Sequence, residues 1–152
     1  MTAEVLNMSP RTAAVGRVPF AGSNKVLVVD DDPLQREFAI CQLSSPELKV
    51  NTAGDGEEAL LKLAEDTYDA ALIDLYMPGL DGLGLIARIK AEPKHRNMPI
   101  IVVSGADDHA LLEQSYRDGA FVFCLKPVSW RLLKAQLNHA LDTARMKRLG
   151  YL

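Results

Sequence analysis

The stretch KVLVVDDDPLQ, which runs from Lys25 to Gln35, changes character in its middle. An apolar run passes without a spacer into three aspartates, and a proline follows. Asp32 directly precedes Pro33, and a carboxylate before a proline at the first helical position is a common helix start. Gln35 falls at the third helical position, as in a capping box. The stretch therefore predicts a buried strand that ends at two aspartates and a helix that begins at Pro33.

The rest of the chain repeats this alternation of strand and helix. Continuous apolar runs, typical of parallel strands buried on both faces, occur at 26–29, 70–73, 100–103 and 121–125, and a weaker strand, expected at a sheet edge, lies at 48–52. Helical patterns lie near 33–43, 56–65, 82–91, 108–118 and 129–148. Five strands each followed by a helix predict an α/β fold, a doubly wound (βα)5 parallel sheet with helices on both faces.

Length and charge limit the classes of function. A chain of 152 residues, 48% of them hydrophobic, is long enough for one core. We expect a flexible N-terminal extension at 1–24, a folded domain at 25–148 and a C-terminal tail at 149–152. The formal net charge of −3 argues against nucleic acid as a partner. The sequence shows no signal peptide and no apolar run of the roughly 18 residues that span a membrane, so we expect a cytoplasmic protein without a membrane partner.

The cysteines and histidines predict no metal or disulfide site. Cys41 and Cys124 lie in apolar contexts without C-x-x-C spacing, so we expect two reduced core residues. His95, His109 and His139 lie in polar contexts and have no partner at metal-ligand spacing. All three are expected at the surface.

Polar side chains follow most of the predicted strands. Asp30 and Asp31 follow the first strand, Asp74 the third, Ser104 the fourth and Lys126 the fifth. In a doubly wound sheet the site lies outside the carboxyl ends of the strands. Three converging carboxylates with one lysine would repel one another, and a hard divalent cation such as Mg²⁺ would remove that repulsion. The pattern predicts a magnesium site, with a solvated acidic rim as the alternative.

These segments resemble the receiver domain of two-component response regulators over about residues 24–146. VVDDD is similar to the acidic pair after the first strand, and LIDLYMPGLDG (72–82) to the phosphoacceptor segment. IIVVSG is similar to the segment with the conserved hydroxyl position, and LKPV to the lysine–proline pair. The resemblance implies a flavodoxin-like sheet with strand order 2-1-3-4-5. It also implies a phosphorelay switch that takes a phosphoryl group from a sensor histidine kinase or a histidine phosphotransfer protein and then controls a downstream protein target.

The resemblance also implies where the phosphoryl group and the metal bind. Asp74 occupies the phosphoacceptor position. Mg²⁺, or Mn²⁺, would be held by Asp31 and Asp74 directly, with Asp30 assisting and the backbone carbonyl of Tyr76 completing the protein ligands. The metal would offset negative charge on the phosphoryl oxygens. The domain would phosphorylate and dephosphorylate itself and would not be a turnover enzyme.

Four further positions follow from the same resemblance. Lys126 and Ser104 would stabilise the phosphoryl group, and movement of Ser104 would be the switch. The Lys126–Pro127 peptide bond would be cis. Two residues depart from the family pattern: Phe123 stands where an aromatic residue with a hydroxyl is usual, and Gly105 follows Ser104 where alanine is usual. Phe123 can fill the same space but cannot donate a hydrogen bond.

A second family shares part of this pattern. In haloacid dehalogenase-like phosphatases a strand-end aspartate is the nucleophile and a second aspartate follows two residues later, which Asp30 and Asp32 could imitate. Those enzymes also use a lysine and then a late acidic pair. Here Lys126 follows the candidate pair Asp107 and Asp108, and the 72–82 segment would have no role. The receiver hypothesis uses more of the sequence.

Charge on the last helices suggests an interface. The helix at 108–118 is acidic and the helix at 129–148 is basic, so a two-fold contact could pair them reciprocally. Together with the fifth strand they make the face through which many receivers dimerise. We expect a weak homodimer linked to phosphorylation. We also expect a single-domain receiver, the alternative being the first domain of a longer regulator.

Overall fold

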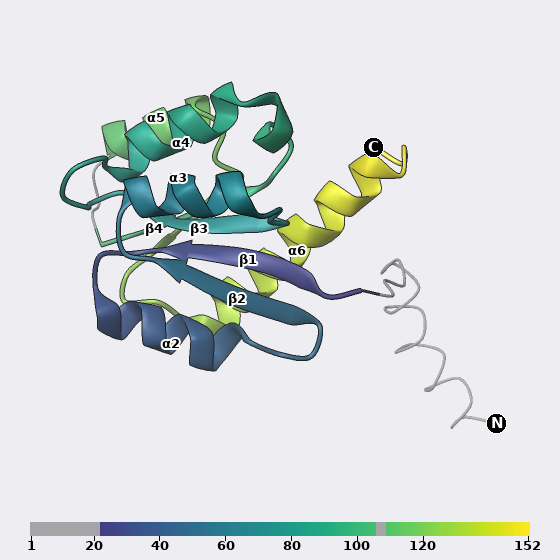
Figure 1. Cartoon of the computed structure of the whole chain (residues 1–152), viewed down its shortest axis with the longest axis horizontal. Helices are drawn as coiled ribbons and strands as arrows, with labels where there is room; N and C mark the ends of the chain where they lie inside the picture. Colours follow the sequence, from purple (N-terminus) through teal and green to yellow (C-terminus); the bar gives the residue numbers. More distant parts are fainter. Residues whose placement is uncertain (1–21, 106–108) are drawn as a thin grey trace.

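The computed structural model describes residues 22–105 and 109–152, which form a five-stranded parallel sheet between two layers of helices (Figure 1). The strands are β1 (Asn24–Val29), β2 (Leu48–Ala53), β3 (Ala70–Asp74), β4 (Ile100–Ser104) and β5 (Val122–Leu125). The helices are α2 (Pro33–Leu43), α3 (Gly56–Glu65), α4 (Gly82–Ala91), α5 (His109–Arg117) and α6 (Trp130–Arg148), with a short 3-10 helix, η1 (Pro93–His95). The order β2-β1-β3-β4-β5 confirms the doubly wound fold and the edge position of the strand at 48–52.

Alternating side chains of the central strands fill two separate cores. Leu27 and Val29 of β1 face α3, α4 and α5, whereas Val26 and Val28 face α2 and α6. Figure 1 shows α3, α4 and α5 on one side of the sheet and α2 and α6 on the other. Because β1, β3 and β4 bury side chains on both faces, they contain the continuous apolar runs at 26–29, 70–73 and 100–103, as the pattern predicted.

The prediction for the last strand was wrong in one respect. The run at 121–125 was expected to be buried on both faces, but β5 lies at the sheet edge, its residues Val122–Cys124 are half-buried and Leu125 is exposed. The local sequence does not distinguish an edge strand from a central one when its residues are apolar. An exposed apolar edge is instead typical of a surface that contacts another molecule.

Two surface predictions also need correction. Cys41 is exposed, because it lies on the outer side of α2, so only the half-buried Cys124 resembles the expected core residue. His95 is buried, because η1 folds it back under the end of α4. No helix among residues 22–105 and 109–152 is long and apolar enough to cross a membrane.

The helix starts follow from their capping residues. Asp32 accepts a hydrogen bond from the backbone N–H of Leu34, so it caps α2 as predicted. The capping box was not formed as expected, because the Asp32 N–H donates to Asp30 rather than to Gln35. Asp55, Asp81 and Ser129 cap α3, α4 and α6 in the same way. The expected N-terminal extension lies outside the described residues up to position 21, and β1 begins at Asn24.

Candidate phosphoacceptor and metal site

Three aspartates meet at the carboxyl edge of the sheet. One carboxylate oxygen from each of Asp30, Asp31 and Asp74 lies within 4.8 Å of the others. Asp30 and Asp74 are buried, at 6% and 5% exposure, and Asp31 is exposed. Since β1 and β3 are neighbours, their ends place these residues together. Three carboxylates at this spacing are the oxygen ligands that Mg²⁺ prefers, so the residues present fit a hard divalent cation.

Lys126 closes the site from the end of β5. Its Nζ lies 3.1 Å from Asp30 Oδ2 and 3.1 Å from Asp74 Oδ2, so a single ammonium group bridges two buried carboxylates. Its backbone N–H donates to the carbonyl oxygen of Ser104 at 2.8 Å, which fixes the end of β5 against β4. The Lys126–Pro127 peptide bond is cis, as the resemblance implies.

Asp30 is held at every polar atom. Its backbone N–H donates to the carbonyl of Ala53, and its Oδ1 accepts from the backbone N–H of Asp32 at 2.9 Å. Oδ2 accepts from Lys126, and its carbonyl oxygen accepts from Arg36 Nη1 at 2.7 Å. Sequence reasoning missed Arg36, which stands in α2 one turn beyond the aspartates. Only its position on the helix face next to the strand end could have suggested this contact.

The charge balance of the site shifts two pKa values. Burial raises the pKa of Asp74 above its ordinary value, although the backbone N–H of Tyr76 and the nearby Lys126 partly oppose this effect. For Lys126, burial alone would lower the pKa, but its hydrogen bond with Asp30 and the charges of Asp30 and Asp74 raise it above its ordinary value. Burial therefore disfavours the ionised form of Asp74, whereas the two carboxylates favour the charged form of Lys126. One lysine cannot neutralise both carboxylates, so the site has room for a further positive charge.

The remaining predicted residues lie on β4, on β5 and directly after β3. Ser104 ends β4 and is fully buried. Phe123, in the middle of β5, is half-buried and packs edge-on against Tyr116 of α5, with ring centroids 5.6 Å apart. The backbone N–H of Tyr76 donates to Asp74 Oδ1 at 3.1 Å, and its side chain is exposed.

Gly82 was not singled out from the sequence, yet it touches the backbone of the acceptor position. A Cβ atom at Gly82 would lie 2.3 Å from the carbonyl oxygen of Asp74 and 2.5 Å from Cα of Leu75. The start of α4 therefore packs directly on the end of β3. The signal was present in the MPGLDG run, whose last residue is this glycine.

The phosphatase alternative loses its support. Asp32, the candidate second aspartate, caps α2 with its side chain. Asp30 is tied to Lys126 and to the backbone, while Asp74 lies beside it in the same centre. Asp107 and Asp108 lie outside the described residues. Asp74 lies in the same cluster as Asp30 and Asp31, and the phosphatase hypothesis gives Asp74 no role there.

Comparison with known proteins gives a consistent result. The family described as "Response regulator receiver domain" matches residues 26–138. The response regulator PleD of Caulobacter vibrioides is 32% identical over 116 residues, which are 76% of this chain and 26% of that protein. The cyclic di-GMP phosphodiesterase response regulator RpfG of Xanthomonas campestris is 32% identical over 119 residues, 77% of this chain and 32% of that protein. The chain thus spans about a third or less of these relatives' length.

A solved structure agrees in fold as well as in sequence. The CheY-like response regulator receiver domain protein from Methanospirillum hungatei superimposes with a TM-score of 0.78 at 25% identity, covering 83% of this chain and 99% of that one. The family match extends from β1 into α6 and so includes all five strands and the acidic centre. The chain belongs to the response regulator receiver domains, the family of phosphoacceptor switches in two-component signalling.

Proposed function

We propose that Asp74 is the phosphoacceptor of this switch. The observation that carries the proposal is the convergence of Asp30, Asp31 and Asp74 with Lys126, whose ammonium group contacts two of the three carboxylates. Asp74 lies at the centre of this group, with one oxygen bonded by the N–H of Tyr76 and the other by Lys126. A carboxylate oxygen of Asp74 attacks the phosphorus of a phosphohistidine. The oxygen–phosphorus bond forms as the nitrogen–phosphorus bond breaks and its electron pair returns to the imidazole.

Residues around Asp74 would hold the metal. Asp31 and Asp74 would be the direct carboxylate ligands, Asp30 would assist, and the backbone carbonyl of Tyr76 would supply a further oxygen. Mg²⁺ or Mn²⁺ held there would offset the charge of the phosphoryl oxygens. The chemistry of the donor set supports this assignment, because receiver domains generally bind Mg²⁺ at an acidic pocket and one oxygen from each of these three carboxylates lies within 4.8 Å of the others.

The switch works through the ends of β4 and β5. Ser104 donates a hydrogen bond to a phosphoryl oxygen, and Lys126 exchanges one of its carboxylate partners for that oxygen. The main-chain bond between Lys126 and Ser104 couples the two strand ends, so both respond together. Phe123 transmits the change by packing, since it has no hydroxyl and already lies against Tyr116 of α5.

The proposed partners are a sensor histidine kinase or a histidine phosphotransfer protein as donor and a downstream protein as target, met in the cytoplasm. The receiver domain is proposed to span residues 25–148, between an extension at 1–24 and a tail at 149–152. The domain itself is a switch that gains and loses one phosphoryl group and does not turn over a substrate. The match covers only 32% of RpfG, so the phosphodiesterase activity in the name of that protein is not proposed for this chain.

A phosphorylation assay tests the proposal. With Mg²⁺ and a small phosphodonor, the protein should gain one phosphoryl group that is stable in acid and labile in base, as an acyl phosphate is. Asp74→Asn should remove it, whereas Asp81→Asn, the same change at an exposed capping aspartate seven residues later, should not. Mass spectrometry of the intact protein measures both. Full modification of the Asp74→Asn variant would refute the assignment.

A further inference from the structure

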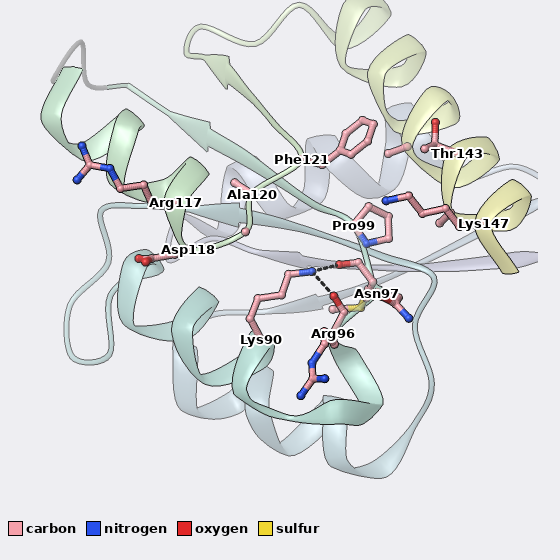
Figure 2. Close-up of a pocket in the computed structure, with 14 residues that line it drawn as sticks. Lys90, Arg96, Asn97, Pro99, Arg117, Asp118, Ala120, Phe121, Thr143 and Lys147 are labelled. Carbon is pink, nitrogen blue, oxygen red and sulfur yellow. Dashed lines mark hydrogen bonds between the residues drawn. The ribbon is translucent and has the colours of Figure 1, made fainter. Parts of the chain in front are cut away.

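A cavity opens beside the amino ends of β4 and β5 (Figure 2), whereas the aspartates lie at the carboxyl ends of the strands. It has a volume of about 490 Å³ and is lined by the turn before β4, the turn before β5 and the last turns of α4 and α6. Pro99 and Phe121 immediately precede the first residues of β4 and β5. A five-residue strand is about 16 Å long, so this cavity and the phosphoacceptor site lie at opposite ends of the same strands.

Two lysines reach into this cavity from opposite walls. Lys90 Nζ, at the end of α4, donates to the backbone carbonyls of Arg96 at 3.0 Å and of Met98 at 2.6 Å. An ammonium group has three N–H donors, so these bonds leave one for a further acceptor. Lys147, in the last turn of α6, extends toward the middle of the cavity beside Pro99 (Figure 2). Both lysines line the cavity. Burial lowers the pKa of Lys90, and the positive charge of Lys147 lowers it further.

Carboxylates of the described chain do little to offset this charge. Asp118 is the acidic residue of the lining, and its Oδ1 accepts a hydrogen bond from Gln114 Nε2 at 2.9 Å. Arg117 and Arg96 add two guanidinium groups at the margin, of which Arg117 pairs with Glu113. The lining therefore carries four cations and one anion.

A purely structural role explains part of this arrangement. Basic residues in the last turns of helices interact favourably with the C-terminal end of the helix dipole, and Lys90 and Lys147 occupy such positions. That role requires neither a cavity nor cations on facing walls. The cavity also has an apolar floor of buried side chains, which would suit the uncharged part of a small molecule. This floor consists of Met98, Pro99, Ala120, Ala140 and Ala144, with Phe121 half-buried at its edge.

We propose that this cavity binds a small organic phosphate with at least two negative charges, held between Lys90 and Lys147. A phosphate group between the two ammonium groups would replace their repulsion by two charge-assisted hydrogen bonds, and the organic part would lie on the apolar floor beside Phe121. A concave site with a partly buried lysine favours such a ligand over a nucleic acid or membrane surface, which would use cations on an open face. The proposal is independent of the phosphoacceptor assignment.

Calorimetric titration with ADP and with pyrophosphate tests the proposal, in magnesium-free buffer with EDTA so that the aspartate site does not take part. Lys147→Gln removes one exposed charge and should weaken binding by about tenfold or more. Arg148→Gln, the same loss of charge one residue later and outside the cavity, should change affinity by less than about twofold. Thr143→Phe, which fills the cavity from α6 without changing its charge, should also weaken binding of ADP.

Amide chemical shifts locate the ligand. The proposal expects shifts at Lys90, Thr143 and Lys147 and none at Asp74 or Ser104. Equal affinities of the wild type and Lys147→Gln, or shifts confined to the aspartate site, would overturn it. Binding to phosphatidylglycerol vesicles without binding of ADP or pyrophosphate would also overturn it, because the basic residues would then serve a membrane surface.

Discussion

The folded protein disfavours the ionised form of the Asp74 carboxylate, and a cation bound beside it would remove this effect. Burial raises its pKa, and Lys126 is shared between it and Asp30. A neutral side chain of the same shape would keep the hydrogen bond from the N–H of Tyr76 and leave Lys126 to Asp30 alone. The proposed phosphoacceptor is therefore expected to destabilise the metal-free protein.

Asp74→Asn is expected to raise the free energy of unfolding of the metal-free protein at pH 7 by roughly 1 kcal/mol, a typical size for a single substitution. Urea denaturation in EDTA measures this change. A concentration of Mg²⁺ 100 times its dissociation constant should stabilise the wild type by about 2.7 kcal/mol and Asp74→Asn by less. Asp81→Asn is the control and should follow the wild type. Lower stability of Asp74→Asn in EDTA would contradict the charge argument.

His95 predicts a pH dependence of stability. Burial and the neighbouring Lys94 lower its pKa below the ordinary 6.5, and Glu92 opposes them in part. Because the folded state has the lower pKa, the unfolded chain binds the proton more readily. The stability that His95 contributes is present above pH 6.5 and is lost as the pH falls through its folded-state pKa.

The unfolding free energy of wild type should therefore decrease more steeply between about pH 7 and pH 5 than that of His95→Gln, which cannot titrate. His139→Gln removes an exposed imidazole from α6 and serves as the control. Parallel pH profiles for wild type and His95→Gln would show that the imidazole takes up its proton in the folded protein without cost.

At the scale of the elements, the start of α4 packs against the end of β3, which carries Asp74. Gly82 lies against the carbonyl of Asp74, and this contact involves two backbones, neither of which can rotate away. Gly84, two positions further along the same helix turn, would place a Cβ 2.8 Å from Cδ1 of Leu80, the end of a flexible side chain. The same substitution at these two glycines should therefore have different effects.

Gly82→Ala is expected to lower the free energy of unfolding by about 1–3 kcal/mol and to slow phosphorylation, because α4 must move away from Asp74. Gly84→Ala should change stability by less than about 1 kcal/mol, since the higher helix propensity of alanine offsets a small shift of Leu80. Urea denaturation and the initial rate of phosphorylation measure both variants. Equal stability of the two variants would show that α4 and β3 adjust freely.

The elements also show which features the sequence could predict. Continuous apolar runs predicted β1, β3 and β4 because each is buried on both faces, and the polar residues after them predicted the site. The half-buried state of β5 was not predicted, because edge position depends on the order of strands rather than on the strand's own residues. The cavity that contains Lys90 and Lys147 is lined by turns that are far apart in the sequence, so no local sequence pattern indicates it.

Contacts with the main chain of another element were the hardest to predict. Arg36 and Gly82 contact backbone atoms of Asp30 and Asp74, which every residue has, so no pairing of residue types marks these two contacts, although Gly82 ends the MPGLDG run. The positions of Ser104 and Lys126 were predictable because Ser104 ends β4 and Lys126 directly follows β5, and these two strands are neighbours. Residues placed by sheet topology were thus found, and residues placed by packing against the main chain were not.

At the scale of the whole molecule, α5, β5 and α6 form a face with exposed apolar side chains. Tyr116, Leu125 and Leu132 are each about half exposed, one from each element. Arg131 and Lys134 are exposed on α6, as the expected charge pattern requires, and Glu113 of α5 pairs with Arg117 of the same helix. Asp107 and Asp108 lie outside the described residues. Apolar contact therefore has to contribute more to a homodimer than charge does.

Phosphorylation is expected to favour a homodimer through this face. Ion pairs between exposed groups contribute roughly 0–1 kcal/mol each, so high salt should weaken the dimer without abolishing it. Sedimentation of the phosphorylated and unphosphorylated protein at low and high salt measures the effect. Leu132→Ser should weaken the dimer, whereas Leu61→Ser, at an exposed leucine on α3, should not. A monomer under all four conditions would contradict the homodimer and would mean that a different protein binds this face.

The edges of the sheet have a consequence for aggregation. An unpaired edge strand offers free N–H and C=O groups to any other chain, which is a common route to fibrils. Here β5 is only four residues long and is followed by the charge of Lys126 and by Pro127, which has no N–H to donate. The opposite edge, β2, has the exposed Lys49 in its second position. Both edges thus limit strand addition, so the protein can keep an apolar face for partners while resisting open-ended polymerisation.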